Sequence, residues 1–400
     1  MEYNTEGNTL KILLPGRIDS SNSAQVDKEL NTVVASQPHE DVVLDAEKLE
    51  YISSAGLRVL MKLKKSAGGA VSIVNASNEV YEIFEVTGFT QLFDVTKQLR
   101  HVSVDGCELI GVGGNGSVYR LDPDTIIKVY KHTATLEKIT TERNYAQAAF
   151  LHGIPTAISY DTVLVGDSYG IVFELLNAKT VGATLSLEPD RAKELGISMG
   201  RLLKTLHTTE MDEGTLPRMS DKIRGWINWM EEMKYLGSED ISLLHSVLEQ
   251  IPERNTIIHS DFHEGNVMIQ NGELILIDLD DICVGHPVYD LAFNYMSHVI
   301  GQARPDIIKK SLNIDDPQLA LEIRAHMMRE YFGGVDDERI RQIDQVIGAM
   351  AMFMSSFIPA KSKDSANMTP ETIQGILDIF VPKFRAAAHA LPAMVGSLGL

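Results

Sequence analysis

Three polar side chains, Asp261, Asn266 and Asp278, are spaced so that a β-hairpin would bring them together. Residues 257–281 read IIHSDFHEGNVMIQNGELILIDLDD, in which two apolar runs meet at Asn271-Gly272. An Asn-Gly pair between apolar runs is among the strongest short-range hairpin signals. The segment therefore predicts a hairpin with polar residues gathered at its open end.

The predicted register sets the positions of the three side chains. If the turn is Asn-Gly, Val267–Ile269 pairs with Leu274–Ile277, and Asn266 and Asp278 emerge side by side. Asp261 lies in the loop that enters the hairpin. Carboxylate and amide oxygens hold Mg²⁺ in phosphoryl-transfer sites, and a nearby carboxylate accepts the proton of the attacking hydroxyl. The ordinary alternative is that these are solvated residues at the end of a hairpin.

The spacing of the polar residues supports the chemical interpretation. His259-x-Asp261-x4-Asn266 equals the spacing of the kinase catalytic loop, and Asp278 then takes the place of the metal-binding aspartate that follows. Other features upstream must decide between the two interpretations.

A glycine-rich segment lies upstream, and it reads IGVGGNGSVYRLDPDTIIKVY. Gly111, Gly113 and Gly116 fit G-x-G-x-x-G, a pattern shared by two kinds of phosphate-binding loop. A dinucleotide fold needs a helix directly after the glycines, whereas a kinase-type loop needs a second strand. SVYRL and TIIKVY are both β-like, and no Gly-Lys-Ser/Thr of a Walker A loop follows. The pattern favours the kinase-type loop.

Lys128 lies within IIKVY, on the strand where a kinase-type loop requires a lysine. Such a lysine pairs with nucleotide phosphates and is held by a helix glutamate; the alternative is an edge-strand lysine whose ammonium reaches solvent. LEKITTERNYAQAAFLHG predicts the helix, and Glu142 is preferred over Glu137 because it falls in the middle of it. Glycine loop, lysine strand and acidic helix in this order make coincidence improbable, and they favour catalysis.

The first hundred residues have a different pattern. Strand-like TLKILLPG, EDVVLDAE and AVSIVNA alternate with helix-like segments, which predicts an α/β layer arrangement. Ser53 and Ser54 lie where a strand gives way to a helix, so a phosphate on either hydroxyl would be favoured by the helix dipole. The alternative is that serine simply caps the helix. TKQLRHVSVDGC is interpreted as the connector to a new domain.

Composition limits the class of protein. The net charge of −19 argues against a nucleic-acid partner, and the hydrophobic content of 44% predicts folding throughout. Two distant cysteines, the lack of a signal peptide and the shortness of the most apolar stretch, residues 346–360, predict a cytoplasmic protein that does not enter the membrane. That stretch is interpreted as a buried core helix.

LDAEKLEYISSAGLRVL resembles the signature of STAS domains, the anti-sigma-factor antagonist family, and the likeness covers roughly residues 1–97. The resemblance implies that Ser54 is a phosphorylated switch and that the domain has an anti-sigma-type protein partner. Ser53 stands where the family often has an acidic residue.

HSDFHEGNVMI and LIDLDDICVGHPVYDLAFNY resemble the two signature segments of the aminoglycoside/choline phosphotransferase family, over about residues 106–300. The resemblance implies an α+β bilobal kinase-like fold with ATP between the lobes, Asp261 as catalytic base, and Asn266 and Asp278 as Mg²⁺ ligands. His263 and Asp290 would support the loop, and either Asp280 or Asp281 would make a second metal contact. The residues expected to bind ATP, or GTP, are Gly111, Gly113, Gly114, Gly116, Val118, Lys128, Glu142, Glu174 and Leu176.

The sequence departs from the family pattern at Ser260 for glycine, Phe262 for leucine and His286 for aspartate. None of these changes removes a group that the chemistry requires, so an active enzyme is expected.

The chain is thus predicted to contain four parts. They are a STAS-like α/β regulatory domain at residues 1–97, a linker at 98–105, a kinase-like N-lobe at 106–175 and a helical C-lobe at 176–400.

Three functions stay open from the sequence. The first is a kinase for a small-molecule hydroxyl with a STAS domain for regulation or docking. It is favoured because Asp278 and Asp290 are only 12 residues apart (290 − 278), which leaves no platform for peptides. The second is a signalling protein whose kinase-like domain phosphorylates Ser54 or a partner protein. The third is a nucleotide sensor without catalysis.

Overall fold

The computed structural model describes residues 1–363 and 368–400 and divides the chain into two units, each with its own hydrophobic core. The first unit comprises residues 1–103 with the stretch 163–166, and the second comprises 104–162 with 167–400. Each unit is described by itself.

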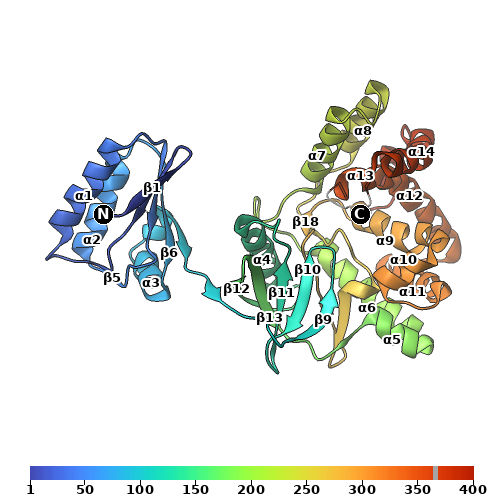
Figure 1. Cartoon of the computed structure of the whole chain (residues 1–400). Helices are drawn as coiled ribbons and strands as arrows, with labels where there is room; N and C mark the ends of the chain where they lie inside the picture. The colour runs from blue at the N-terminus through green and yellow to red at the C-terminus, as the bar shows by residue number, and fades with distance from the viewer. Residues whose placement is uncertain (364–367) are drawn as a thin grey trace. The chain divides into compact units, whose positions relative to one another are not determined.

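The first unit is built on a five-stranded sheet in the order β1-β2-β4-β6-β7, in which β1 is antiparallel to β2 and the other neighbours are parallel (Figure 1). Leu10 and Ile12 alternate with half-buried residues along β2, as expected for a strand with one face in the core. The strands are β1 Tyr3–Glu6, β2 Thr9–Leu13, β4 Asp41–Asp45, β6 Val71–Ala76 and β7 Asp94–Lys97, with β3 Arg17–Ile18 paired separately to β5 Tyr51–Ile52.

Helices α1 (Ser23–Ser36) and α2 (Ser54–Ser66) pack against each other, and α3 (Asn78–Val86) contacts β6 and β7. A 3-10 turn, η1 (Phe89–Gln91), precedes β7. The predicted α/β class is confirmed. Thr96 and Lys97, the first residues of the segment interpreted as a connector, belong to the last strand of the sheet, and the predicted linker 98–105 begins after that strand. This strand was missed because it is mostly exposed and lacks an apolar run.

The second unit begins with a β-rich lobe. Its sheet contains the neighbouring strands β12-β13-β11-β10-β9 in this order. The pairs β9–β10, β10–β11 and β11–β13 are antiparallel. The predicted strands around the glycine loop are present, and no helix follows the glycines. The elements are β9 Glu108–Val112, β10 Gly116–Arg120, β11 Thr125–Tyr130, α4 Leu136–Leu151, β12 Ser159–Val165 and β13 Ser168–Glu174; the short β8 Arg100–His101 precedes them.

The remainder of the second unit is mainly helical, which confirms the bilobal kinase-like class (Figure 1). Its helices and 3-10 turns are α5 Val181–Leu187, η2 Pro189–Arg191, α6 Ala192–Thr208, α7 Met219–Glu232, α8 Ser238–Gln250, η3 Glu264–Asn266, α9 Val288–His298, η4 Ile300–Ala303, α10 Pro305–Leu312, α11 Pro317–Tyr331, α12 Asp337–Ser355, α13 Ile358–Lys361, α14 Pro370–Ala387 and α15 Leu391–Gly396. The apolar stretch 346–360 falls in α12 and α13 and lines the core. Within the described part of the chain, no helix is both long and apolar enough to span a membrane.

The central hairpin follows the sequence prediction. Strands β16 (Val267–Gln270) and β17 (Glu273–Leu276) pair antiparallel, with Val267 opposite Leu276. The turn residues Asn271 and Gly272 have φ of +53° and +85°. Positive φ at both positions is the requirement of a type I′ turn. Strand β14 (Lys179–Thr180) adds to β16, and β15 (Ile257–Ile258) pairs with β18 (Cys283–Val284).

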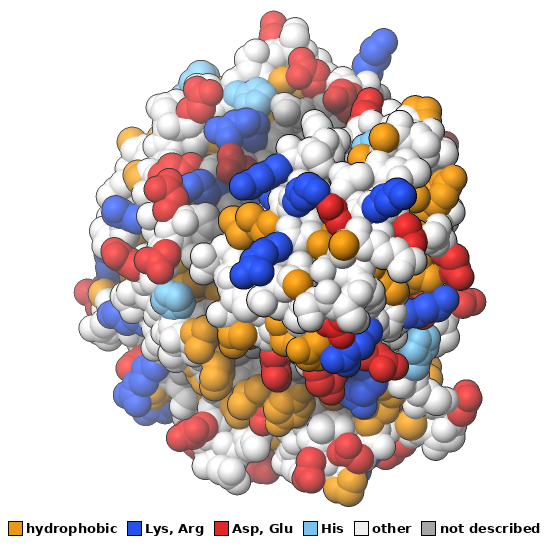
Figure 2. Space-filling view, turned by 90° about the vertical axis from the view of Figure 1, so that its left-hand side faces the viewer, with side chains coloured by type: hydrophobic (Ala, Val, Ile, Leu, Met, Phe, Trp, Pro, Cys, Tyr) orange, Lys and Arg blue, Asp and Glu red, His pale blue; other side chains and the backbone are white. Residues whose placement is uncertain are grey.

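The surface carries charges of both signs. On the face seen in Figure 2, Lys and Arg side chains are interspersed with Asp and Glu side chains, and hydrophobic side chains are exposed between them. The net charge of −19 therefore does not make that face uniformly acidic.

Substituting Gly272 should destabilise the second unit, because an added Cβ disfavours φ of +85°. We expect Gly272→Ala to lower the free energy of unfolding by about 1 kcal/mol, measured by denaturant titration. Gly375→Ala is the matched control: Gly375 lies inside α14 with open space around its Cβ position, and the same change there should raise stability by about 1 kcal/mol. Equal effects of the two substitutions would contradict the prediction.

Candidate active site

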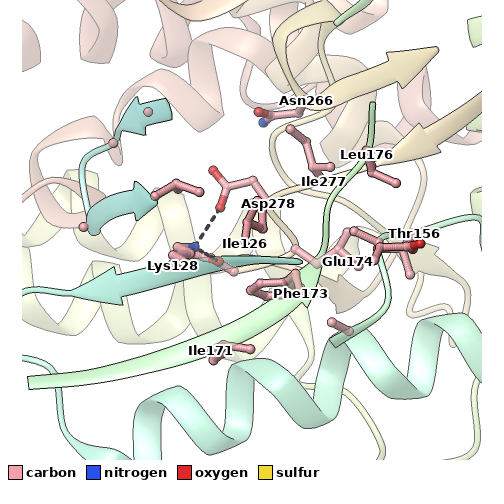
Figure 3. Close-up of a pocket in the computed structure, with 18 of the residues that line it drawn as sticks. Ile126, Lys128, Thr156, Ile171, Phe173, Glu174, Leu176, Asn266, Ile277 and Asp278 are labelled. Carbon is pink, nitrogen blue, oxygen red and sulfur yellow. Dashed lines mark hydrogen bonds and ion pairs between the residues drawn. The ribbon is translucent and has the colours of Figure 1, made fainter. Parts of the chain in front are cut away.

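A cavity of about 380 Å³ lies in the second unit, between the glycine-loop sheet and the hairpin (Figure 3). Most of the predicted site residues line it. These are Gly111, Gly113, Gly116, Val118, Lys128, Glu142, Glu174, Leu176, Asn266 and Asp278. Gly114 and Asp261 are not among its lining residues, and Ser54 belongs to the first unit.

Lys128 is the charged centre of the cavity. Its Nζ lies 3.1 Å from Glu142 Oε1, 3.2 Å from Asp278 Oδ1 and 2.6 Å from Asp280 Oδ1. Burial opposes its charge, but the three carboxylates outweigh burial and raise the pKa of the ammonium. Lys128 is therefore a fixed positive charge that joins β11, α4 and the segment after β17.

Glu142 and Glu137 were the two candidates for the helix partner. Glu137 is exposed to solvent, whereas Glu142 is 9% exposed and contacts Lys128. The Tyr130 hydroxyl also donates a short hydrogen bond to the Glu142 carboxylate. The difference follows from the helix: α4 turns Glu142 with Ile139 and Ala146 toward the interior.

Asp280 was not predicted as a partner of Lys128. Besides that contact, its Oδ2 accepts a hydrogen bond of 2.8 Å from Asn115 Nδ2 at the tip of the glycine loop. Burial, helped by a hydrogen bond and repulsion from Glu142, raises its pKa from 3.8 to about 6 in spite of Lys128. Asp280 is thus a carboxyl whose proton is held more tightly than usual. Sequence carries no local signal for a contact between residues 152 positions apart.

Asp278 has a left-handed backbone, with φ of +59°. Such a conformation is uncommon for residues other than glycine, although aspartate adopts it more readily than most, and strained backbone concentrates at functional sites. Its side chain is 49% exposed and points into the cavity (Figure 3). Burial and the neighbouring Asp280 raise its pKa.

Asn266 links the cavity to Asp261. Its Nδ2 donates to the Asp261 backbone oxygen at 3.1 Å and to Asp261 Oδ2 at 3.2 Å, so the amide oxygen is the atom available to a ligand. An amide oxygen and the Asp278 carboxylate are hard oxygen donors of the kind that Mg²⁺ prefers. The two residues fit a magnesium ion that also uses phosphate oxygens and water. No group of three or more His, Cys, Asp or Glu side chains among the described residues could hold a metal by itself.

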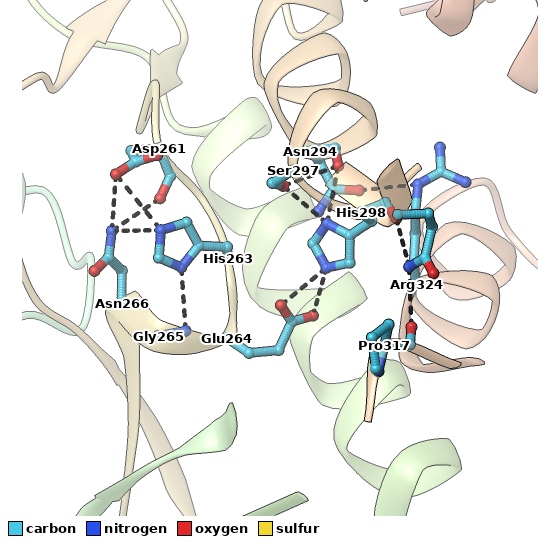
Figure 4. Close-up of polar contacts among 11 residues, drawn as sticks. Asp261, His263, Glu264, Gly265, Asn266, Asn294, Ser297, His298, Pro317 and Arg324 are labelled. Carbon is cyan, nitrogen blue, oxygen red and sulfur yellow. Dashed lines mark hydrogen bonds and ion pairs between the residues drawn. The ribbon is translucent and has the colours of Figure 1, made fainter. Parts of the chain in front are cut away.

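Asp261 is an ionised carboxylate whose side chain is partly exposed to solvent. It is 54% exposed, and its Oδ2 lies 3.5 Å from His263 Nε2 (Figure 4). Burial works against its charge, but the His263 hydrogen bond and the charges of His263 and Lys361 outweigh burial and hold its pKa well below the usual range.

Asp290 holds the loop that carries Asp261. Its carboxylate accepts hydrogen bonds from the backbone N–H of His259 at 2.7 Å and of Ser260 at 2.6 Å, and lies 3.1 Å from His207 Nε2. Ser260 has φ of +67°, a conformation that suits the glycine of the family pattern. The two backbone N–H groups that donate to the Asp290 carboxylate keep serine in this strained conformation.

His286 stands where the family pattern has aspartate. It is buried, and burial followed by the charges of Arg254 and His207 lowers its pKa to about 4. Its neutral ring accepts a hydrogen bond of 3.2 Å from the N–H of Val288, the first residue of α9. Histidine thus satisfies one of the free N–H groups at the start of α9. Phe262, the third departure, is a core residue with 1% exposure.

Two lysines that the sequence did not reveal lie on the Asp261 side of the site. Lys361 Nζ is 2.9 Å from Asp281 Oδ2 and 3.4 Å from the backbone oxygen of Ser260. Lys222 Nζ is 3.7 Å from Asp281 Oδ1. Asp281 therefore faces two ammonium groups and not the glycine loop, so Asp280 is the residue of the two that lies near Asp278.

In the first unit, Ser54 is the exposed first residue of α2. Its neighbour Ser53 is the cap, because Ser53 Oγ accepts a hydrogen bond from the N–H of Ala55. Capping thus explains Ser53 and leaves the hydroxyl of Ser54 on the surface.

A glycine loop, a lysine strand with its helix glutamate, and a hairpin carrying Asn266 and Asp278 around one cavity define a bilobal, kinase-like phosphotransferase class. The chain belongs to the phosphotransferase enzyme family (APH), whose sequence model matches residues 106–312, and the STAS domain model matches residues 1–102. Both resemblances seen in the sequence are thus confirmed.

Individual proteins are similar to parts of the chain. BtrV of Bordetella bronchiseptica, named as a candidate anti-sigma factor antagonist, is 38% identical over 85 residues, which cover 20% of this chain and 72% of BtrV. A STAS-domain protein of Pseudomonas aeruginosa is 33% identical over 94 residues, covering 23% of this chain and 91% of that protein. Among solved structures, the gentamicin complex of APH(2″)-IIa is 15% identical, with a TM-score of 0.46, and covers 78% of this chain and 99% of that one.

The pH dependence of the free energy of unfolding should reveal the raised pKa of Asp280. A carboxyl with a higher pKa in the folded than in the unfolded state binds its proton more tightly when folded, so the contribution of Asp280 to the stability of wild type falls as pH rises from about 4 through about 6. We expect Asp280→Asn to unfold like wild type near pH 4 and to be more stable by roughly 2 kcal/mol near pH 8, in denaturant titrations at both pH values.

Asp281→Asn is the matched control. Burial raises the pKa of Asp281, but the charges of Lys361 and Lys222 outweigh burial and lower it. Its ionised form therefore stabilises the fold above the unfolded pKa, and the asparagine variant should be less stable than wild type near pH 8. A loss of stability in Asp280→Asn at that pH would contradict the assignment of Asp280.

Proposed function

We propose that the second unit transfers the γ-phosphoryl group of ATP, or GTP, to a hydroxyl of a small molecule, with Mg²⁺ as cofactor. The observation that carries the proposal is the cavity in which Lys128, Asn266 and Asp278 meet, with Asp261 attached through Asn266. These are the group types that phosphoryl transfer needs, and catalysis there is mainly positioning and electrostatic stabilisation.

Each residue has a role in this proposal. Lys128 would bind nucleotide phosphates, held by Glu142 at 3.1 Å. Asn266 and Asp278 would hold Mg²⁺, which when bound neutralises phosphate charge. The Gly111–Gly116 loop would cover the phosphates, and the backbone from Glu174 to Leu176 would contact the base.

Asp261 would orient the acceptor hydroxyl and take its proton. With a pKa well below the usual range, it is a weak base in the ground state. The proton would therefore move late, when bond formation to phosphorus has made the hydroxyl acidic. Asp261 acts mainly by aiming the hydroxyl at the phosphoryl group.

A small acceptor is favoured by the segment between Asp278 and Asp290. Residues 282–290 are all buried, and Cys283–Val284 pair with Ile257–Ile258 inside the lobe. A buried segment offers no exposed platform for a peptide substrate. The cytoplasm, where such metabolites and ATP occur, is the location that we propose.

The first unit would regulate the enzyme or dock a partner. The exposed Ser54 at the start of α2 favours a phosphorylation switch, because a phosphate there meets the free N–H groups of the first turn. The likeness to BtrV supports an anti-sigma-type protein partner. Phosphorylation of Ser54 by the second unit is the second candidate function, and nucleotide sensing without catalysis is the third.

Asp261→Asn should lower the transfer rate about 10³-fold while nucleotide affinity changes less than about twofold, because the amide keeps the shape but cannot accept the proton. The measurement is turnover of MgATP against a panel of amino alcohols and sugars, with nucleotide affinity from calorimetry. Asp306→Asn, a change at an exposed acid paired with Arg304, is the control and should behave like wild type. Nucleotide binding without any transfer by wild type would favour the sensor.

Ser54→Ala distinguishes the small-molecule kinase from the self-modifying protein. Incubation with γ-labelled ATP should leave both wild type and Ser54→Ala without label if the second unit acts on metabolites only. Label on wild type that disappears in Ser54→Ala, and persists in Ser53→Ala, would establish the second candidate instead. Label that remains in Ser54→Ala would place the modification on another residue.

A further inference from the structure

Glu264 and His298 form a carboxylate–imidazole pair beside the loop that carries Asp261 and Asn266, and the proposed reaction does not use this pair (Figure 4). Glu264 Oε1 and Oε2 both lie 2.9 Å from His298 Nε2. Both side chains have 0% exposure. The pair lies outside the residues that line the nucleotide cavity.

Both nitrogens of the His298 ring have polar partners. Nδ1 lies 2.8 Å from the backbone oxygen of Asn294 and 2.9 Å from Ser297 Oγ. Nε2 faces the two carboxylate oxygens of Glu264. Burying a polar pair of this kind is expensive, and a pair of apolar side chains of similar volume is often at least as stable. Stability alone therefore does not account for the pair.

Glu264 is the first residue of η3, the three-residue turn Glu264–Asn266 that presents Asn266 to the cavity. Hydrogen bonds to His263 hold the turn from within the loop: the N–H of Asn266 donates to the His263 backbone oxygen at 3.0 Å, and the N–H of Gly265 donates to His263 Nδ1 at 3.1 Å. Packing is close on one side, since a Cβ on Gly265 would lie 2.1 Å from the backbone oxygen of Ser311. On the other side the Glu264 carboxylate anchors the turn to His298.

His298 is in turn anchored to the helical frame. It is the last residue of α9, and its backbone oxygen accepts a hydrogen bond of 3.0 Å from Gln302 Nε2, which also donates to the Pro317 backbone oxygen at 2.9 Å. Arg324 Nε donates to Asn294 Oδ1 at 3.1 Å, and Arg324 pairs with Asp344 at 2.8 Å. These contacts join α9, α11 and α12, so the His298 ring is fixed relative to the C-lobe.

We propose that Glu264 and His298 are positioning residues that hold η3, so that Asn266 keeps its amide oxygen toward Mg²⁺ and its Nδ2 on Asp261. The inference rests on the proposed function and adds two residues to its machinery. Residues that orient metal ligands are worth about 10–100-fold in metal affinity or activity when they are removed.

The test uses Glu264→Met/His298→Phe in the full chain, since the two apolar side chains fill similar volume without a buried charge. The melting temperature should stay within about 4 °C of wild type. The apparent affinity for Mg²⁺ at saturating nucleotide should fall at least about 10-fold, and turnover about 10–100-fold with little change in the KM for nucleotide. Amide exchange over residues 261–266 should accelerate, while exchange in α11 stays unchanged.

Arg385→Ala is the control. It removes another partly buried ion pair, Arg385 with Asp240 at 2.5 Å, at a place remote from the loop in sequence and contacts, and Mg²⁺ affinity should not change. The single variants Glu264→Met and His298→Phe each leave one buried polar side chain without its partner and should be less stable than the double variant.

The outcomes separate the inference from the proposed function. A double variant that binds Mg²⁺, turns over and exchanges like wild type would overturn the positioning role. Absence of Mg²⁺-dependent nucleotide binding and turnover in wild type would overturn the proposed function. In that case the amide hydrogen exchange of residues 261–266 still tests whether the pair holds the turn, because faster exchange in the double variant supports this role and unchanged exchange contradicts it.

Discussion

One ammonium group faces three carboxylates in this site, and the arrangement of the second unit depends on it. Glu142, Asp278 and Asp280 come from a helix and from the segment after the hairpin, and Lys128 lies within 3.2 Å of each. Without the ammonium, three like charges would repel one another inside a partly buried cavity. The lysine strand, the acidic helix and the hairpin must therefore all be in place before the ammonium can balance the three carboxylates. The excess of negative charge also explains why nucleotide phosphates would need a divalent cation to enter.

The strained backbone of the site is held by neighbouring hydrogen bonds. Asp278 and Ser260 have φ of +59° and +67° and flank the hairpin at its open end. Conformations of this kind persist only where the surroundings over-determine them. For Ser260 the surroundings are the Asp290 carboxylate, and for Asp278 they include the bond from Lys128. The same contacts that fix the charges thus fix the backbone that carries them.

The sequence was informative where the signal is local. The Asn271-Gly272 turn, the strands beside the glycine loop and the inward face of α4 follow from periodicity and turn chemistry within a few residues. The sequence could not reveal contacts between segments that are far apart in the chain. These are the contact of Asp280 with Lys128, the Glu264–His298 pair and the lysines around Asp281, which only the folded lobe brings together. The exposed strand β7 was missed because too little of it is buried to leave a pattern.

The two sides of the site differ in charge, and this difference explains why the family motifs do not identify the acceptor. Around Lys128 the carboxylates are in excess, whereas Asp281 on the Asp261 side faces two lysines, Lys361 and Lys222. In the proposed reaction the motif residues would act on the phosphates, and their chemistry would be the same for any hydroxyl. The lysines come from α7 and α13, outside both signature segments. A polycationic acceptor needs an excess of carboxylates, and next to Asp261 two ammonium groups balance the two carboxylates. Selection of an acceptor would therefore depend on the helices of the C-lobe, whose sequence pattern indicates only which residues are buried.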